Sequence, residues 1–225
     1  SKLYQRIIEL AHDNRLVDGA GQQPHFSLRT LTRTLSYARC IASMCSLRRA
    51  LYEGMQMSFM TFLDAESSKL VQPLLEQHLF AKLKSANSEL RKALRKPEDG
   101  RSYVQGYPGS KHWVCQGREE LRDQPHYIIT PFIRNNLENL VRASSTRQFP
   151  VLIQGPTSSG KTSMIEYLAG RTGHKFVRIN NHEHTDLQEY LGTYVSGADG
   201  KLQFQEGILV KALREGHWIV LDELN

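Results

Sequence analysis

A stretch with the composition of a phosphate-binding loop lies in the last third of the sequence. Residues 155–162 read GPTSSGKT and fit the pattern G-x-x-x-x-G-K-[ST] at every position. The glycines of this pattern let the backbone curl so that successive N–H groups face phosphate oxygens. A helix that follows such a loop adds the positive end of its dipole. The sequence therefore predicts that this loop binds the phosphates of a nucleotide.

The pattern also predicts a role for each residue of the loop. Gly155 and Gly160 permit the turns of the backbone. Lys161 is expected to reach the β- and γ-phosphates, and Thr162 to hold Mg²⁺ through its hydroxyl. The predicted nucleotide-binding set is completed by the other loop residues, which are Pro156, Thr157, Ser158, Ser159 and Ser163.

A second motif, WIVLDE at residues 218–223, is typical of a buried strand that ends in acidic side chains. Asp222 then lies at the carboxyl edge of a sheet beside the phosphate loop, where it holds the Mg²⁺ shell together with Thr162. The neighbouring Glu223 is placed to orient and deprotonate an attacking water. ATP and Mg²⁺ are therefore the predicted cofactors, and Lys161 and Glu223 are the predicted catalytic residues.

The elements around these motifs read as the first part of an open α/β sheet, a P-loop core that is incomplete at its C-terminal side. Apolar runs predict three strands, at 150–154, 175–180 and 217–223. Thr130 and Pro131 mark the start of a helix, as cap and first helical residue. Helical patterns cover 131–143, 162–173 and 208–216, and a β-hairpin is predicted at 192–207.

The first 96 residues follow a different pattern, typical of a small helical bundle. Apolar residues at three-to-four spacing predict helices over 2–11, 28–44, 46–63 and 67–83. Ser27 is the predicted N-cap of the second helix. The buried face of that helix is predicted to carry Leu28, Leu31, Leu35 and Ala38, and the methionines of the third helix, Met55, Met57 and Met60, are interpreted as core filling.

Three ranges are therefore expected: a helical part at 1–96, a linker at 97–126 that is rich in Pro and Gly, and an α/β part at 127–225. The net charge of +6 is unevenly placed: the first part carries 15 Lys and Arg against 8 Asp and Glu, or +7, and residues 97–225 carry −1. A basic surface of this kind suits RNA or an acidic partner. Without an RNA-binding motif, a solvated helical surface is favoured, and direct RNA contact stays open.

Composition argues against several classes of protein. The longest apolar runs are too short to cross a bilayer, so no membrane partner is expected. Three cysteines without CxxC spacing argue against a disulfide framework or a zinc site. His182 and His184 lack an evident third ligand, which favours a polar loop over a metal centre.

The sequence resembles the midasin family, the dynein-related AAA+ ATPases of large-ribosomal-subunit assembly. The resemblance rests on HYIITP, VLIQGPTSSGKTSMIEYLA, FVRINNHEHTDLQEYLGTYVSGADGKLQFQEG and WIVLDELN, which are spread over residues 126–225. It implies an AAA+ core whose hairpin at 192–207 is the insert of this clade. It also implies that adenine is contacted around Tyr127, Ile128 and Ile129.

The resemblance further implies what the helical part does and what partners to expect. An AAA+ module is followed by a helical lid, so residues 1–96 are expected to be the lid of a preceding module. In the segment FSLRTLTR, Arg29 is then expected to be the sensor 2 arginine. The implied partners are ATP, other AAA modules of the same chain, and the pre-60S particle with its assembly factors, and the implied location is the nucleus, including the nucleolus.

Two further expectations follow from the resemblance. The arginine finger, sensor 1 and lid of this ATP site are expected beyond Asn225, so residues 1–225 alone should bind nucleotide weakly and hydrolyse it very slowly. Two alternatives stay open: a structural module that binds nucleotide without hydrolysis, and another chaperone of the dynein and MoxR clade.

Overall fold

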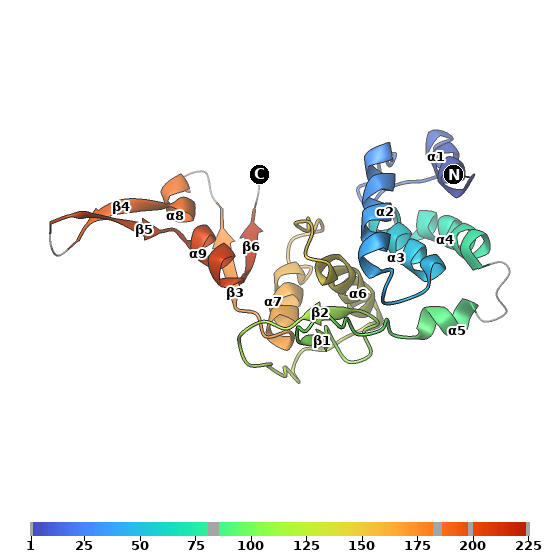
Figure 1. The fold of residues 1–225 in the computed structure, drawn as a ribbon. Helices are drawn as coiled ribbons and strands as arrows, with labels where there is room; N and C mark the ends of the chain where they lie inside the picture. The colour runs from blue at the N-terminus through green and yellow to red at the C-terminus, as the bar shows by residue number, and fades with distance from the viewer. Residues whose placement is uncertain (1, 81–85, 182–185, 198–199, 224–225) are drawn as a thin grey trace. The chain divides into compact units, whose positions relative to one another are not determined.

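The structure, a computed structural model, describes residues 2–80, 86–181, 186–197 and 200–223 (Figure 1). The chain forms two compact units. The first, here called the helical unit, comprises Ser1–Val114 and Arg134–Leu152. The second, here called the α/β unit, comprises Cys115–Ile133 and Ile153–Asn225. These limits differ from the predicted boundaries after residues 96 and 126, because residues 97–114 and most of the helix after Pro131 pack with the helical unit.

The helical unit begins with the four predicted helices. They are α1 Lys2–His12, α2 Leu28–Ile41, α3 Leu47–Ser58 and α4 Ala65–Phe80, with a 3-10 turn η1 Met60–Phe62 after α3. A fifth helix, α5 Ala86–Arg91, was not predicted. The start of α2 lies where expected, since the backbone N–H of Ser27 donates to the Thr30 hydroxyl at 3.3 Å. Met55 and Met60 lie in the apolar core between α1, α3 and α4, as predicted.

The predicted buried face of α2 is only partly right: Ala38 is buried as predicted, but Leu28 and Leu35 are not. Leu28 and Leu35 are 71% and 51% exposed, whereas the buried residues of the helix are Thr34, Tyr37, Ala38 and Ile41. Close packing against α3 explains the difference, because a Cβ at Gly54 would lie only 2.6 Å from the Thr34 carbonyl oxygen. The missing side chain at Gly54 lets the two backbones meet at Thr34, and this contact decides which face is buried.

Residues 97–114, predicted as linker, are folded into the helical unit. They contribute two short paired strands, β1 Tyr103–Gln105 and β2 Trp113–Cys115. The Trp113 indole N–H donates to the Leu94 carbonyl oxygen at 2.7 Å. Most of the predicted helix after Pro131 belongs to the same unit, and it runs as α6 Pro131–Ser145 with the Thr130 hydroxyl accepting the N–H of Ile133.

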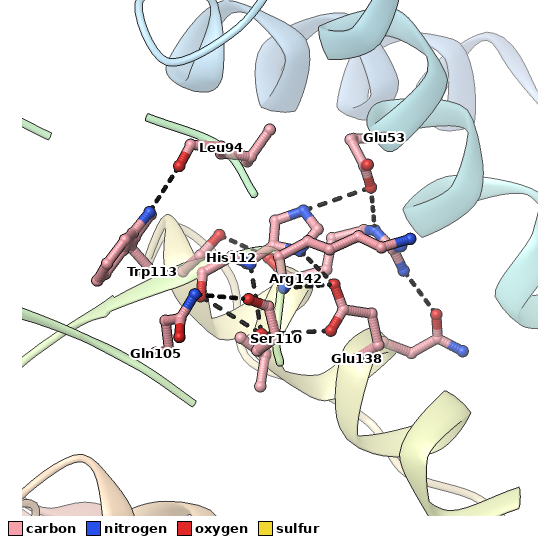
Figure 2. Close-up of polar contacts among 12 residues, drawn as sticks. Glu53, Leu94, Gln105, Ser110, His112, Trp113, Glu138 and Arg142 are labelled. Carbon is pink, nitrogen blue, oxygen red and sulfur yellow. Dashed lines mark hydrogen bonds and ion pairs between the residues drawn. The ribbon is translucent and has the colours of Figure 1, made fainter. Parts of the chain in front are cut away.

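A buried cluster of charged side chains ties α3, residues 107–112 and α6 together (Figure 2). Glu53 on α3 is 1% exposed and accepts from Arg49 Nε at 2.6 Å and from Arg142 Nε at 2.7 Å. His112 is fully buried between two carboxylates, 3.3 Å from Glu53 and 2.8 Å from Glu138. Because Arg142 and Glu138 stand on α6, this helix packs with the helical unit, and the unit boundary shifts accordingly.

The surroundings of the two carboxylates favour their charged forms. Burial alone would raise the pKa of Glu53, but the nearby charges of Arg142, His112 and Arg49 hold it well below its usual range. For Glu138, burial is likewise outweighed by His112, by the Tyr107 hydroxyl that donates to it at 2.6 Å, and by Arg142. Its pKa is lowered from 4.5 to about 2.

The α/β unit contains the elements predicted after the phosphate loop. They are α7 Lys161–Arg171, β3 Phe176–Asn180, α8 Leu187–Leu191, the hairpin β4 Gly192–Ser196 and β5 Leu202–Glu206, α9 Ile208–Glu215, and β6 Trp218–Asp222. Only the short helix α8 was not predicted. Strands β3 and β6 pair in parallel, with Phe176 opposite Trp218 and Asn180 opposite Asp222. Helix α7 packs against β3 and so carries the loop to the sheet.

The predicted strand at 150–154 is wrong. Val151 and Leu152 are 44% and 86% exposed, and residues 150–154 carry no strand geometry. A strand needs a hydrogen-bonded neighbour, and within the described residues the parallel sheet consists of β3 and β6. A short apolar run cannot reveal whether such a neighbour exists, which is why the pattern misled here.

One further finding concerns membranes. In the part of the chain that the structure describes, no helix combines the length and the apolar character that crossing a bilayer requires.

The shared role of Glu53 makes a prediction about stability. Glu53→Gln keeps the shape of the side chain but removes the charge that its cationic neighbours share. The free energy of unfolding should fall by about 3–5 kcal/mol, because the buried cations lose their compensation. The measurement is urea unfolding followed by Trp113 fluorescence, with the other tryptophan, Trp218, replaced by Phe. Glu66→Gln, which removes an exposed partner of Lys69, is the control and should change little; equal losses would contradict the prediction.

The lowered pKa of Glu138 makes a prediction about acid. A carboxylate with a depressed pKa stabilises the fold fully above its ordinary pKa of 4.5, and this contribution disappears as the pH falls toward about 2. The unfolding free energy of the parent chain should therefore drop over this range more steeply than that of Glu138→Gln, which has no charge to lose. Urea unfolding at a series of pH values measures both slopes, and parallel curves would contradict the assignment.

Candidate nucleotide-binding site

The phosphate loop is open on the surface of the α/β unit and directly precedes α7. Residues 154–160 are all exposed. Two of them have the left-handed backbone that the predicted curl requires, Ser158 with φ 62° and Gly160 with φ 80°. Gly160 is also the N-cap of α7, directly before its first residue, so the first free N–H groups of the helix lie next to the loop. The backbone therefore offers donors to an anion from both the loop and the helix.

Lys161 closes the loop on itself. Its ammonium donates to the carbonyl oxygens of Gly155 at 2.9 Å and Pro156 at 2.6 Å. The same group lies 3.5 Å from the Ser159 hydroxyl. The positive charge is thus held over the curled backbone, at the place where phosphate oxygens would replace these carbonyls.

The two predicted metal residues are brought together. The Thr162 hydroxyl donates to Asp222 Oδ2 at 3.2 Å, although the residues come from α7 and β6. With its hydrogen directed to the carboxylate, the hydroxyl oxygen keeps lone pairs for a hard cation, and Mg²⁺ typically takes few protein oxygens beside those of phosphates. The donor set therefore fits Mg²⁺ bound together with a nucleotide.

The described residues contain no cluster of three His, Cys, Asp or Glu side chains that would hold a metal without such help. His182 and His184, interpreted above as loop residues, lie outside the described residues.

The position of Asp222 is fixed by the pairing of β6 with β3. Asn181, which follows β3, donates to the Asp222 carbonyl oxygen twice, from its backbone N–H at 3.1 Å and from its side-chain amide at 2.8 Å. The end of β6 is thereby held against the end of β3, with the Asp222 side chain free to face Thr162. Asn181 was not among the predicted site residues.

Arg178 is a second residue that the sequence reasoning missed. Its guanidinium contacts Asp222 Oδ2 with Nε at 2.8 Å and with Nη2 at 2.7 Å. The available signal was a single charge inside the otherwise apolar strand FVRIN, two residues before an Asn that faces Asp222 across the pair. Residues two apart on a strand share a face, so this position points the arginine toward the same carboxylate.

Glu223, the predicted general base, lies just beyond β6 and is exposed. Its φ of 56° is left-handed, so the chain turns away from strand geometry directly after Asp222. Among the residues that the structure describes, its carboxylate has no hydrogen-bond or ion-pair partner. The side chain is therefore open to solvent, as a group that acts on water requires.

The segment with the predicted adenine contacts lies along α7. The ring of Tyr127 stacks on that of Tyr167, with centroids 4.2 Å apart and planes 15° apart. Ile128 is 76% exposed and Ile129 is half-buried, so both have surface available to a ligand. Arg29, the predicted sensor 2 residue, is exposed in the first turn of α2 and belongs to the helical unit.

Residues 115–126, assigned above to the linker, form part of the framework of this site together with Tyr127. Their backbone N–H groups donate to the end of α7 and beyond it, from Gly117 to Thr172, from Glu119 to Gly173 and from Arg122 to Gly170, at 2.8 to 2.9 Å. The approach at Gly117 is so close that a Cβ there would lie 1.9 Å from the Gly173 carbonyl oxygen. The segment is thus attached to the helix that carries the phosphate loop.

Both ends of the chain match known protein families. Residues 1–82 match the family described as "Midasin AAA lid domain", and residues 150–225 match the "AAA domain (dynein-related subfamily)". The chain is 48% identical to the midasin of Dictyostelium discoideum over 220 residues and 34% identical to that of Giardia intestinalis over 218 residues. These matches cover 94% and 91% of the chain, which spans about 4% of the length of either relative.

A shorter similarity exists to a bacterial protein. The denitrification regulatory protein NirQ of Pseudomonas aeruginosa is 39% identical over 75 residues, which is 33% of this chain and 28% of that protein.

The attachment of residues 115–127 makes a prediction for Gly117→Ala. The added methyl group meets backbone rather than a movable side chain, so the segment has to leave α7, at a cost of about 1–3 kcal/mol. Limited trypsin digestion should then cut faster after Arg118 and Arg122. Gly19→Ala is the matched control, because nothing lies within 4 Å of a Cβ there and its φ is not left-handed. Equal cleavage rates in the two variants would show that the segment is not held in this way.

Proposed function

The chain belongs to the midasin family and contains a lid and an AAA domain of that family, and on this premise we propose that it binds and hydrolyses ATP as part of a ring-forming AAA+ ATPase. The proposal extends to the cellular task that the resemblance implies. Turnover of ATP drives the release of assembly factors from pre-60S ribosomal particles in the nucleus and nucleolus. The partners are then the pre-60S particle and other AAA modules of the same chain.

The observation that carries the ATPase proposal is the contact between Thr162 and Asp222. It joins the residue after the phosphate-binding lysine to the acid at the end of β6, at 3.2 Å. Mg²⁺ bound at this pair would neutralise charge on the β- and γ-phosphate oxygens. The chain's own residues do the rest: Lys161 exchanges loop carbonyls for phosphate oxygens, and the loop N–H groups hold those oxygens in place.

Glu223 supports hydrolysis rather than binding alone. A carboxylate without a partner in the described residues, next to the metal acid, is suited to orient a water and to accept its proton. A purely structural nucleotide site has no use for this group. The arginine finger, which stabilises the charge of the transition state, is proposed to come from another AAA module, and Arg29 is proposed to act on the nucleotide of the preceding module.

Two variants of the full-length protein test the proposal. Lys161→Ala should abolish nucleotide binding here, whereas Glu223→Gln should keep nucleotide bound and lower turnover at this site by a factor of about 10² or more. Binding at this one site is read by photolabelling with azido-ATP and detecting the tryptic peptide that contains α7. This peptide is 162–171 in the parent and in Glu223→Gln, and 148–171 in Lys161→Ala, which lacks the cut after residue 161. Turnover is read as phosphate release.

Glu189→Gln is the control for loss of a carboxylate, since Glu189 is exposed on α8. It should behave as the parent protein does. If Glu223→Gln turned over ATP as fast as Glu189→Gln while the peptide was labelled, the site would be a structural nucleotide module, which is the alternative proposal.

A further inference from the structure

The metal acid of the site is already occupied by a cation that belongs to the chain. Asp222 Oδ2 accepts hydrogen bonds from the Thr162 hydroxyl at 3.2 Å and from Arg178 Nε at 2.8 Å, and it forms an ion pair with Arg178 Nη2 at 2.7 Å. All three contacts fall on the same carboxylate oxygen. Arg178 therefore competes for the oxygen that also faces the hydroxyl of the predicted metal ligand.

The sheet enforces this arrangement. In the parallel register Arg178 lies opposite Val220, and Asp222 lies two residues further along the same face of the sheet. A diagonal neighbour at this separation is within reach of a long side chain. The Asn181 side-chain amide also donates to the Asp222 carbonyl oxygen, which fixes the backbone of Asp222. A backbone movement that would carry the carboxylate away from Arg178 is therefore restrained.

The ion pair between Arg178 and Asp222 is well defined in geometry, and it is also exposed enough to solvent for a competing cation to replace Arg178. The Arg178 side chain is 51% exposed and that of Asp222 is 23% exposed, so neither charge is locked in the interior. Two nitrogens on one oxygen make a more definite contact than a single ammonium would. A divalent ion that approaches this oxygen meets a positive charge that has to move or share its partner.

We propose that Arg178 is a positioning residue that holds the Asp222 carboxylate in the nucleotide-free site. Mg²⁺ has to displace Arg178 from this carboxylate in order to bind. The residue at position 178 therefore sets the Mg²⁺ concentration that nucleotide binding requires. The inference rests on the proposed function, because it concerns the same ATP site. Its consequence is that Mg²⁺ alone binds poorly and that Mg²⁺ with phosphate charge succeeds, since the phosphates supply the negative charge that Arg178 otherwise cancels.

The test is a Mg²⁺ titration of nucleotide binding in the full-length protein. Azido-ATP labelling of peptide 162–171 is measured at fixed nucleotide over a series of Mg²⁺ concentrations, which reads binding at this site and not hydrolysis. Arg178→Ala should lower the half-saturating Mg²⁺ concentration by about two- to tenfold. Labelling at saturating Mg²⁺ should not decrease. Arg178→Lys keeps the positive charge but lacks the planar guanidinium with its several N–H donors. Its Mg²⁺ titration curve should therefore lie between those of the parent protein and of Arg178→Ala.

Arg214→Ala is the matched control. Arg214 is 60% exposed in the same unit and pairs with Glu206 at 2.6 Å, away from the phosphate loop, so its removal should leave the Mg²⁺ curve unchanged. A half-saturating concentration for Arg178→Ala equal to that of Arg214→Ala, or higher, would overturn the inference. Weaker labelling at every Mg²⁺ concentration would also overturn it, because Arg178 would then only support the local structure.

The outcome for the parent protein separates this inference from the proposed function. If the parent peptide is labelled and only the shift is missing, the role of Arg178 is wrong and the ATP site stands. If the parent peptide is not labelled at any Mg²⁺ concentration, the proposed function itself is overturned, and the role of Arg178 with it.

Discussion

The negative charge of Glu53 is the constraint on which the helical unit is built. A carboxylate that is 1% exposed has to be compensated where it stands, because water is not available to it. Its partners come from three parts of the chain: Arg49 from its own helix, His112 from the segment between β1 and β2, and Arg142 from α6. Compensation of the Glu53 charge thus brings α3, the segment between β1 and β2, and α6 together. No shared hydrophobic periodicity in the sequence would predict this contact.

The α/β unit uses a related arrangement for a different purpose. Asp222 is also a carboxylate next to a guanidinium, but both side chains keep access to solvent. The same pair of chemical groups therefore serves as a fixed element of the core in one unit and as an exchangeable one in the other. Burial decides between the two roles, since leaving a buried partner costs far more than leaving an exposed one.

Local patterns predicted what depends on neighbours in sequence. The helices α1–α4, α7 and α9, the hairpin and strands β3 and β6 follow from periodicity and caps, and the loop with its acid follows from motif spacing. The predictions that fail depend on distant partners. The face of α2 is decided by Gly54, and the exposure of Leu152 by the lack of a paired strand. The placement of α6 is decided by a charge on α3. The role of Arg178 needs the register of β3 and β6, which the sequence does not state.

The left-handed backbone at Glu223 has a consequence for how relatives of this chain diverge. For a residue other than Gly or Asn such a conformation costs about 1 kcal/mol or more, and here a Glu adopts it directly after Asp222. If the proposed hydrolysis of ATP is lost from a module, nothing offsets that strain. The substitutions then favoured are Gly and Asn, which adopt this backbone most readily. In such a lineage, Gly or Asn directly after the acid indicates that hydrolysis has been lost. The substitution is then explained by relief of backbone strain and not by a new chemical role.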